Sequence, residues 1–138
     1  QISVFSIFTA NATTTITGLT LFNNTATGYS IFYISSTNST LTMSDIHLID
    51  NIASGYNGDL FLSLYGGALH AFDITSQGGD SLQGIGNVVI DAVCRQTTSC
   101  ILEDLMLDGG SIILQPDTTP TRVDIIVISH IGTNPGAL

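Results

Sequence analysis

Carboxylates are the most numerous groups in this chain that could do chemistry. Hydrolysis of a glycosidic bond uses two carboxylates roughly 5 to 10 Å apart, one of them with a raised pKa. Asp91 and Asp108 each follow an apolar segment of strand character, so they are the best pair for that reaction. An Asp directly after a strand is also a common turn residue. Turn formation is the interpretation that we favour for both residues.

The remaining ionisable groups do not complete an active site. A lyase needs a cationic base and usually calcium-binding carboxylates, but the only Lys or Arg residues are Arg95 and Arg122. The three histidines, His47, His70 and His130, are scattered over apolar-rich segments, where packing roles are more common. No Gly-x-Ser-x-Gly, phosphate loop or His-Glu-x-x-His motif is present. We therefore expect no enzymatic activity and no cofactor.

Cys94 and Cys100 flank the segment Arg-Gln-Thr-Thr-Ser. In an oxidising compartment they could close a small disulfide loop, which would stabilise the fold by on the order of 2 kcal/mol. In a reducing cell they would be two buried thiols. No His or second Cys pair lies at metal-ligand spacing, so we do not expect a metal site. The pair is a disulfide candidate.

Three Asn-x-Thr sequons, the acceptor motif for N-linked glycans, lie in the N-terminal part of the chain, the last of them ending at Thr40. The acceptor candidates are Asn11, Asn23 and Asn38. A chain this rich in Asn and Thr would contain roughly one or two sequons by chance. Glycosylation and coincidence therefore both remain open.

The composition limits the classes of partner. The chain of 138 residues has eleven Asp and Glu against two Lys and Arg, a net charge of −9. This balance argues against binding to nucleic acid or to anionic membranes, which require clustered cations. Ser- and Thr-rich chains without Lys are typical of secreted surface proteins. The sequence has no secretory leader and no apolar run of transmembrane length, so we expect a trimmed chain that does not span a membrane.

The elements that would position these groups are short strands. An internal repeat aligns Thr17–Gly28 with Ser44–Gly55 without a gap, and the copies share apolar-x-apolar-x-x-Asn-x-Ala-x-Gly. Stacking such units about 4.8 Å apart would bury their apolar faces in one column. We therefore predict an all-β, right-handed parallel β-helix (solenoid) with degenerate rungs, as a single domain over residues 1–138. Asn24 and Asn51 would stack at its corners.

The expected strands are separated by Gly-, Asn-, Asp- and Ser-rich segments. They are Ile2–Phe8, Thr15–Phe22, Ser30–Ile34, Thr40–Ile49, Leu60–Tyr65, Ala68–Ile74, Asn87–Val93, Ile101–Leu107, Ser111–Leu114 and Arg122–His130. The alternative fold is a β-sandwich completed by a neighbour's strand. The donated strand would contain Ile2, Val4, Phe5, Ile7 and Phe8.

The repeat resembles a known family. Two segments are similar to the repeat of right-handed parallel β-helix surface proteins such as polymorphic outer-membrane-protein passengers. The first is Leu21 to Ala26 followed by Gly28 to Ile31, and the second is Leu48 to Ala53 followed by Gly66-Gly67-Ala68-Leu69. In this alignment the second copy carries an insertion from Gly55 to Tyr65. The resemblance implies a secreted or surface-exposed adhesin, coat or scaffold protein.

The leading functional expectation is a structural protein of the cell surface. It would assemble end to end with copies of itself into a filament, or form part of a longer surface β-helix, because a solenoid without capped ends exposes unpaired backbone groups. The first alternative is a carbohydrate-binding or carbohydrate-cleaving β-helix. The second is a pilus-like subunit with donor-strand complementation. N-linked glycans would be its other partners.

Overall fold

The computed structural model describes residues 4–28, 30–54, 58–77, 88–107, 111–116 and 126–133. These residues form strands and connecting turns and contain no helix. The strands are β1 (Phe5–Ala10), β2 (Thr13–Phe22), β3 (Thr25–Ala26), β4 (Phe32–Ile49), β5 (Ile52–Ala53), β6 (Leu60–Gln77), β7 (Val88–Arg95), β8 (Ser99–Leu107), β9 (Ser111–Pro116) and β10 (Ile126–Thr133).

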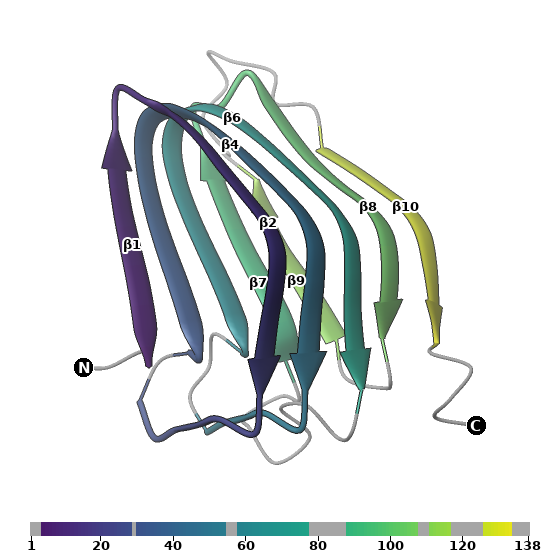
Figure 1. Cartoon of the computed structure of the whole chain (residues 1–138). Coiled ribbons are helices and arrows are strands. Elements are labelled where there is room, and N and C mark those ends of the chain that lie inside the picture. Colours follow the sequence, from purple (N-terminus) through teal and green to yellow (C-terminus); the bar gives the residue numbers. More distant parts are fainter. Residues whose placement is uncertain are drawn as a thin grey trace.

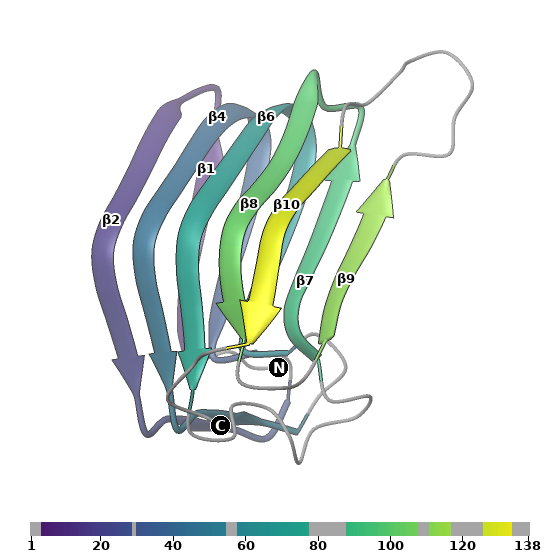
Figure 2. The same ribbon diagram turned by 90° about the vertical axis from the view of Figure 1, so that its right-hand side faces the viewer.

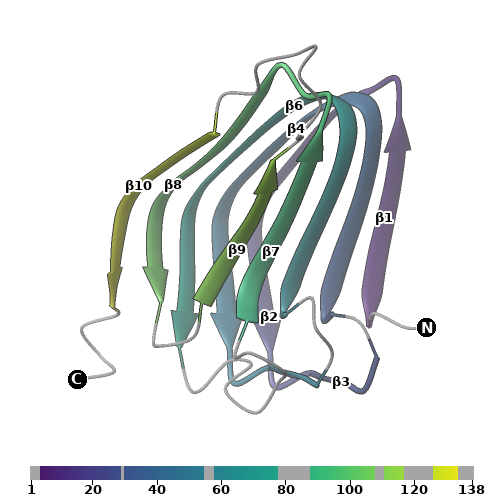
Figure 3. The same ribbon diagram turned by 180° about the vertical axis from the view of Figure 1, so that it is seen from behind.

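The strands stack in parallel as a β-solenoid of about three turns (Figure 1). One face contains β1, β4, β6, β7 and β9, in that order. On the other face, β2, β4, β6, β8 and β10 lie side by side (Figure 2). The two long strands β4 and β6 belong to both faces, and the short pair β3–β5 lies at the base (Figure 3). The predicted solenoid is therefore confirmed.

The register shows the length of each rung. Phe5 pairs with Phe32, and Phe32 pairs with Leu60, so the second step along the chain is one position longer than the first. We call β1, β2 and β3 the first rung, β4 and β5 the second, and β6 the third. Thr17 pairs with Ser44, so the repeat spacing that the sequence predicts is the true spacing between the first two rungs.

Single residues in the left-handed conformation turn the chain at each corner without breaking the ladder. Eight described residues other than glycine have φ between 48° and 55°, and all are Asn, Asp or Gln. Asn and Asp tolerate this region better than most residues. Together with Gly18 and Gly66, which also have positive φ, these eight residues stack in three columns. The columns are Asn11, Asn38, Gly66 and Gln96 at the first corner; Gly18, Asp45, Asp73 and Asp104 at a bend in the second face; and Asn23 and Asp50 at the second corner.

These left-handed residues explain where the predicted strand boundaries differ from the structure. The sequence predicts separate strands on either side of Asn38, whereas β4 continues through it from one face to the other. The same happens in β6 at Gly66 and Gly67. A single left-handed residue changes the direction of the strand while the neighbouring rungs keep it hydrogen-bonded.

The core lies between the two faces and consists of stacked aliphatic columns. Met43, Ala71 and Leu102 form one column and Ile46, Ile74 and Leu105 another, all of them fully buried. Alternate residues of β4 and β6 point inward and outward, as the burial pattern of both strands shows. The outward positions are therefore the ones available to ligands and partners.

The β-sandwich completed by a donated strand is wrong as a description of this chain. Phe5, Ile7 and Phe8 of the proposed donated strand lie in β1, which pairs in parallel with β4 of the same chain along its whole length. A sandwich of that kind would require antiparallel hairpins. Nearly all described pairs are instead parallel, with one isolated antiparallel bridge, between Gly58 and Ile90.

The Gly-Gly-Ala segment does not have the place that the repeat alignment gives it. In the structure, Ala68 pairs with Thr40 and Gly67 with Ser39, so this segment forms the first corner of the third rung. The stretch 60–65, which the alignment treats as inserted, pairs in register with 32–37. The second rung thus contains no such insertion. The likeness of the Gly-Gly-Ala segment to the passenger repeat is weaker in the structure than its residue types indicate.

Candidate functional site

The uncovered side of the first rung is the most distinctive surface of the described residues. We call it the open edge: the side of β1 and β2 that faces away from β4. Among the described residues nothing pairs with β1 or β2 on this side. Four inward-pointing residues there are only partly buried: Ile7, Ile16, Leu19 and Leu21.

The second rung shows what a covered rung looks like. The column partners of those four residues are Ile34, Met43, Ile46 and Leu48, each with no exposed surface. The side chains are of the same kind and point the same way. The difference in burial therefore comes from the third rung, which covers the second from the side that the first rung leaves open.

The backbone at the open edge offers hydrogen-bonding groups as well as apolar surface. The N–H of Phe5 donates to the carbonyl of Ile31, and the N–H of Asn11 donates to the carbonyl of Thr37. Because alternate residues of a strand bond to opposite neighbours, the intervening residues of β1 direct their backbone groups toward the open edge. These residues are Ser6, Phe8 and Ala10.

Aromatic side chains continue this pattern on the outside of the first face. Tyr33 and Phe61 stack with ring centroids 5.1 Å apart, and Phe8 meets Tyr33 edge-on at 5.7 Å. On the inward side of the same face, Phe5 lies over the buried ring of Phe32, with the rings tilted and their centroids 5.2 Å apart. Phe8 and Phe5 are 72% and 52% exposed, because no ring covers them from the open edge.

Four of the five residues that the sequence selects as an assembly strand are described, and they lie at this edge. Val4, Phe5 and Phe8 are exposed and Ile7 is partly buried. Ile2 lies outside the described residues. The sequence missed Phe22, which is 61% exposed at the end of β2 and extends the apolar part of the open edge onto the second face.

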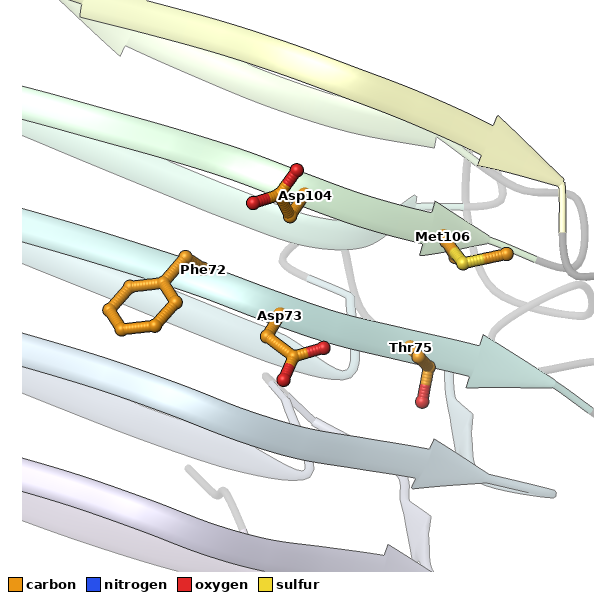
Figure 4. A pocket seen from close by; sticks show the side chains of 5 residues that line it. All are labelled: Phe72, Asp73, Thr75, Asp104 and Met106. Carbon is orange, nitrogen blue, oxygen red and sulfur yellow. The ribbon is translucent and has the colours of Figure 1, made fainter.

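A second surface of interest is the bend in the second face, where Asp45, Asp73 and Asp104 stack on successive strands. A shallow pocket of about 470 Å³ lies beside two of them (Figure 4). Its lining residues are Phe72, Asp73, Thr75, Asp104 and Met106. Each Asp occupies a left-handed position, so its type is explained by the backbone before any ligand is considered.

Two histidines form hydrogen bonds on this same outer face. Nε2 of His47 is 2.9 Å from Oδ1 of Asp45, and Nδ1 of His47 is 2.7 Å from the hydroxyl of Thr75. Nε2 of His70 lies 2.5 Å from Oε1 of Glu103. Each imidazole thus bridges adjacent strands or neighbouring side chains. The side chain of His130, on β10, lies outside the described residues.

Only one member of the pair that sequence reasoning favours for glycosidic chemistry lies within the described residues. Asp91 is on β7 and 3% exposed, and Asp108 lies outside the described residues. The carboxylates that share a pocket are instead Asp73 and Asp104. Their signal in the sequence is an Asp followed by an aliphatic residue, which also occurs at Asp45 one rung earlier.

Asn24 and Asn51 stack at the second corner. The side-chain N–H of Asn24 donates to Oδ1 of Asn51 at 3.0 Å, and so does its backbone N–H at 3.1 Å. The amide of Asn51 in turn donates to the carbonyl of Leu21 at 2.8 Å. The left-handed residues of this corner are one position earlier, at Asn23 and Asp50. Turning and stacking are therefore divided between neighbouring residues.

Cys94 and Cys100 form a disulfide across the inside of the first corner, between β7 and β8. Both side chains are buried. The connection between these strands is one residue longer than in the third rung, since Tyr65 and Ala68 pair with Arg95 and Ser99. The disulfide thus joins β7 to β8 across the longer corner.

The three sequon asparagines lie on the surface at the corners. Asn11 and Asn38 stack at the first corner, and Asn23 is at the second. All three are exposed. In the part of the chain that the structure describes, no three His, Cys, Asp or Glu residues are grouped so that they could hold a metal ion. Within those residues there is also no helix long and apolar enough to cross a membrane.

Comparison with known proteins adds no relative. No family model, no curated protein and no solved structure matches this chain.

Proposed function

We propose that this chain is an extracellular structural module that extends a β-solenoid through its open edge, either by stacking end to end with further copies into a filament or as part of a longer surface β-helix. One observation carries this proposal. Inward-pointing residues that are partly buried in the first rung belong to columns that are completely buried in the second. A further parallel rung is the partner that fits such a surface.

The energetic case is the burial of apolar surface together with backbone pairing. A rung added to β1 and β2 would cover Ile7, Ile16, Leu19 and Leu21 as the third rung covers their partners in the second. Apolar burial contributes about 25 cal/mol per Å². The outward N–H and C=O groups of β1 would then also be paired, which gives the added rung its register.

The charge of the chain sets the conditions for assembly. Each copy carries a net charge of −9, so stacking brings like charges together. Salt screens this repulsion, with a Debye length of about 10 Å at 0.1 M. We therefore expect filament formation to increase with ionic strength.

An extracellular location is supported by the disulfide between Cys94 and Cys100, because disulfides persist mainly in oxidising compartments. The likeness of the repeat to polymorphic outer-membrane-protein passengers supports the cell surface in particular. Both observations agree with a chain that has many Ser and Thr residues and no Lys.

Electron microscopy of the purified chain tests the proposal, with variants at the most exposed aromatic residue of the open edge. Phe8→Pro removes an N–H that points toward the open edge and retains the bonds of β1 to β4. Phe8→Thr removes the aromatic ring but keeps that N–H. We expect filaments from the wild-type chain, shorter filaments from Phe8→Thr and monomers from Phe8→Pro.

Sedimentation over a range of protein and salt concentrations measures the same equilibrium in solution. A wild-type chain that remains monomeric at high concentration and high salt would rule out self-assembly. Filaments that form equally well from Phe8→Pro would show that contacts elsewhere hold the copies together.

The pocket beside Asp73 and Asp104 favours carbohydrate binding as a second candidate function. It combines two carboxylates, which accept hydrogen bonds from sugar hydroxyls, with the ring of Phe72 and the hydroxyl of Thr75. Carboxylates would repel acidic polymers, so the expected ligand is a neutral oligosaccharide.

Calorimetric titration with neutral β-linked glucan oligosaccharides tests this second candidate. We expect Asp73→Asn and Asp104→Asn to weaken binding, whereas Asp45→Asn is a matched control from the same column outside the pocket. Release of reducing ends during the titration would show cleavage as well as binding. Equal affinities for all three variants would rule out the pocket.

A further inference from the structure

The asparagines of the described residues fall into two groups. Asn24 and Asn51, which are not in sequons, use their side-chain amides in hydrogen bonds between rungs. The sequon asparagines Asn11, Asn23 and Asn38 are exposed, and their side chains form no hydrogen bond to other described residues. The amides that could be modified are therefore the ones without a hydrogen bond among the described residues, although Oδ1 of Asn38 packs over Gly66.

The third residue of each sequon lies on the surface as well. Thr13, Thr25 and Thr40 are all exposed. A transferring enzyme that must reach both the amide and the hydroxyl of the sequon would find them together at the start of a strand or beside a corner. Asn11 and Asn38 are stacked in adjacent rungs, and so are their threonines, which pair in the register of β2 and β4.

Comparison between rungs shows that the backbone does not require Asn at these corners. The first-corner column continues with Gly66 and Gln96, and the second-corner column continues with Asp50. All of these residues have positive φ. The left-handed conformation therefore explains a tolerance for Asn but not its choice.

The threonines change together with the asparagines. Where Gly66 replaces Asn38 in the next rung, Ala68 replaces Thr40. Where Asp50 replaces Asn23, Ile52 replaces Thr25. The strand alone would accept Thr or Ile at these positions. Across the first three rungs Asn and Thr are thus present or absent together, as a recognition motif requires and corner geometry does not, whereas the next step of the first-corner column pairs Ser99 with Ala68 and has Gln96 in place of Asn.

We propose that Asn11, Asn23 and Asn38 are acceptors of N-linked glycans. The donor is an oligosaccharide attached through its anomeric carbon to a lipid pyrophosphate. The amide nitrogen of Asn forms the new bond to that carbon, the carbon–oxygen bond to the pyrophosphate breaks, and the amide gives up one proton to a base of the transferring enzyme. The lipid pyrophosphate leaves with the bonding electron pair.

This inference rests on the extracellular location in the proposed function, and it adds a role for the corners. The glycans would extend sideways from the turns between β1 and β2 and after β2 (Figure 1). They would shield the sides of the solenoid and leave the sheet edges accessible. Lateral association would therefore be hindered, whereas stacking along the solenoid axis would remain possible.

For the test, the full chain is secreted behind a leader peptide from a eukaryotic cell. Its intact mass is measured before and after enzymatic removal of N-glycans. Each acceptor is replaced by a residue that its own column or corner already contains: Asn11→Gln as at Gln96, Asn23→Asp as at Asp50, and Asn38→Gly as at Gly66. We expect the wild-type chain to lose three glycans on digestion and each variant to lose one fewer.

Threonine variants separate the sequon from the corner. Thr13→Ala, Thr25→Ala and Thr40→Ala leave the Asn in place and should each remove one glycan, whereas the corresponding Thr→Ser variants should retain it. A secreted chain with the mass of the bare polypeptide would overturn the proposal. A variant that keeps the wild-type glycan mass would overturn the assignment at that residue. Filament imaging of the digested protein is read separately, so a failure of assembly is distinguishable from a lack of glycans.

Discussion

The first and second rungs are built from the same kinds of residue and differ in what covers them. Leu19 and Ile46 occupy one column, yet Leu19 is partly buried and Ile46 is completely buried. Asn24 and Asn51 show the same difference at the second corner. Burial in a solenoid is therefore a property of neighbouring rungs, and substitutions at matched positions should show how much stability each neighbour contributes.

The largest expected difference is at the first corner. A Cβ on Gly67 would lie 2.0 Å from the carbonyl oxygen of Ser39 in the second rung, and the φ of Gly67 is 79°. We expect Gly67→Ala to destabilise the fold by more than about 3 kcal/mol, because a backbone atom cannot move aside as a side chain can. Equilibrium urea denaturation followed by circular dichroism measures this change.

The first rung supplies the control. Ala12 stands in the same column and already carries a methyl group. We expect Ala12→Gly to destabilise the chain by no more than about 1 kcal/mol, through backbone entropy alone. If Gly67→Ala were as mild as Ala12→Gly, close packing between corners would not constrain the rungs.

The second prediction concerns the apolar columns. We expect Ile46→Ala to lower the free energy of unfolding by about 3 kcal/mol, because it leaves a cavity between two covering rungs. Leu19→Ala should lower it by about half as much in the monomer, since Leu19 is already partly solvated. The same denaturation measurements on both variants test the ratio.

Assembly should reduce this difference. If a further rung covers the open edge, the effect of Leu19→Ala in filaments should rise toward that of Ile46→Ala. A ratio that stays the same in filaments would mean that assembly does not bury the first rung.

The third prediction compares the stacked asparagines. Asn51 is buried and its side chain joins the first rung to the second, accepting from Asn24 and donating to Leu21. We expect Asn51→Ala to destabilise the chain by about 2 kcal/mol, because a carbonyl and two N–H groups lose their partner. Asn24→Ala should have about half that effect, since its side chain remains open to solvent on one side. Equal values would argue that the ladder contributes through geometry rather than through burial.

The sequence predicts the architecture because the repeat contains both the apolar period and the corner residues. The alignment of 17–28 with 44–55 matches the true register of the first two rungs. It does not reveal the third copy, because Ser76 interrupts the apolar pattern inside the core and no Asn-x-Ala follows Gln77 in the sequence. Side-chain identity alone cannot show which polar residues a column can bury.

The candidate sites were harder to predict, for a related reason. Asp73 and Asp104 are distant in sequence, and only the pairing of β6 with β8 places them on adjacent strands. Their Asp-aliphatic signal is short and occurs elsewhere in the chain. The sequence predicts an uncapped end and an assembly strand near the N-terminus. It does not predict the exposure of Phe22, because that depends on which face of β2 points outward.

The smallest expected effect concerns the bend in the second face, where the first rung has Gly18 and the later rungs have Asp. A Cβ on Gly18 would lie 3.6 Å from Oδ2 of Asp45, so a side chain fits. Gly18→Asp would add a carboxylate one strand from Asp45, and two charges about 5 Å apart repel by on the order of 0.8 kcal/mol in water. Gly18→Asn has the same shape without the charge. We expect Gly18→Asp to be the less stable variant at low salt and the two to be equal in about 1 M NaCl. Equal stability at low salt would show that the carboxylate of Asp45 does not repel a second charge at this position.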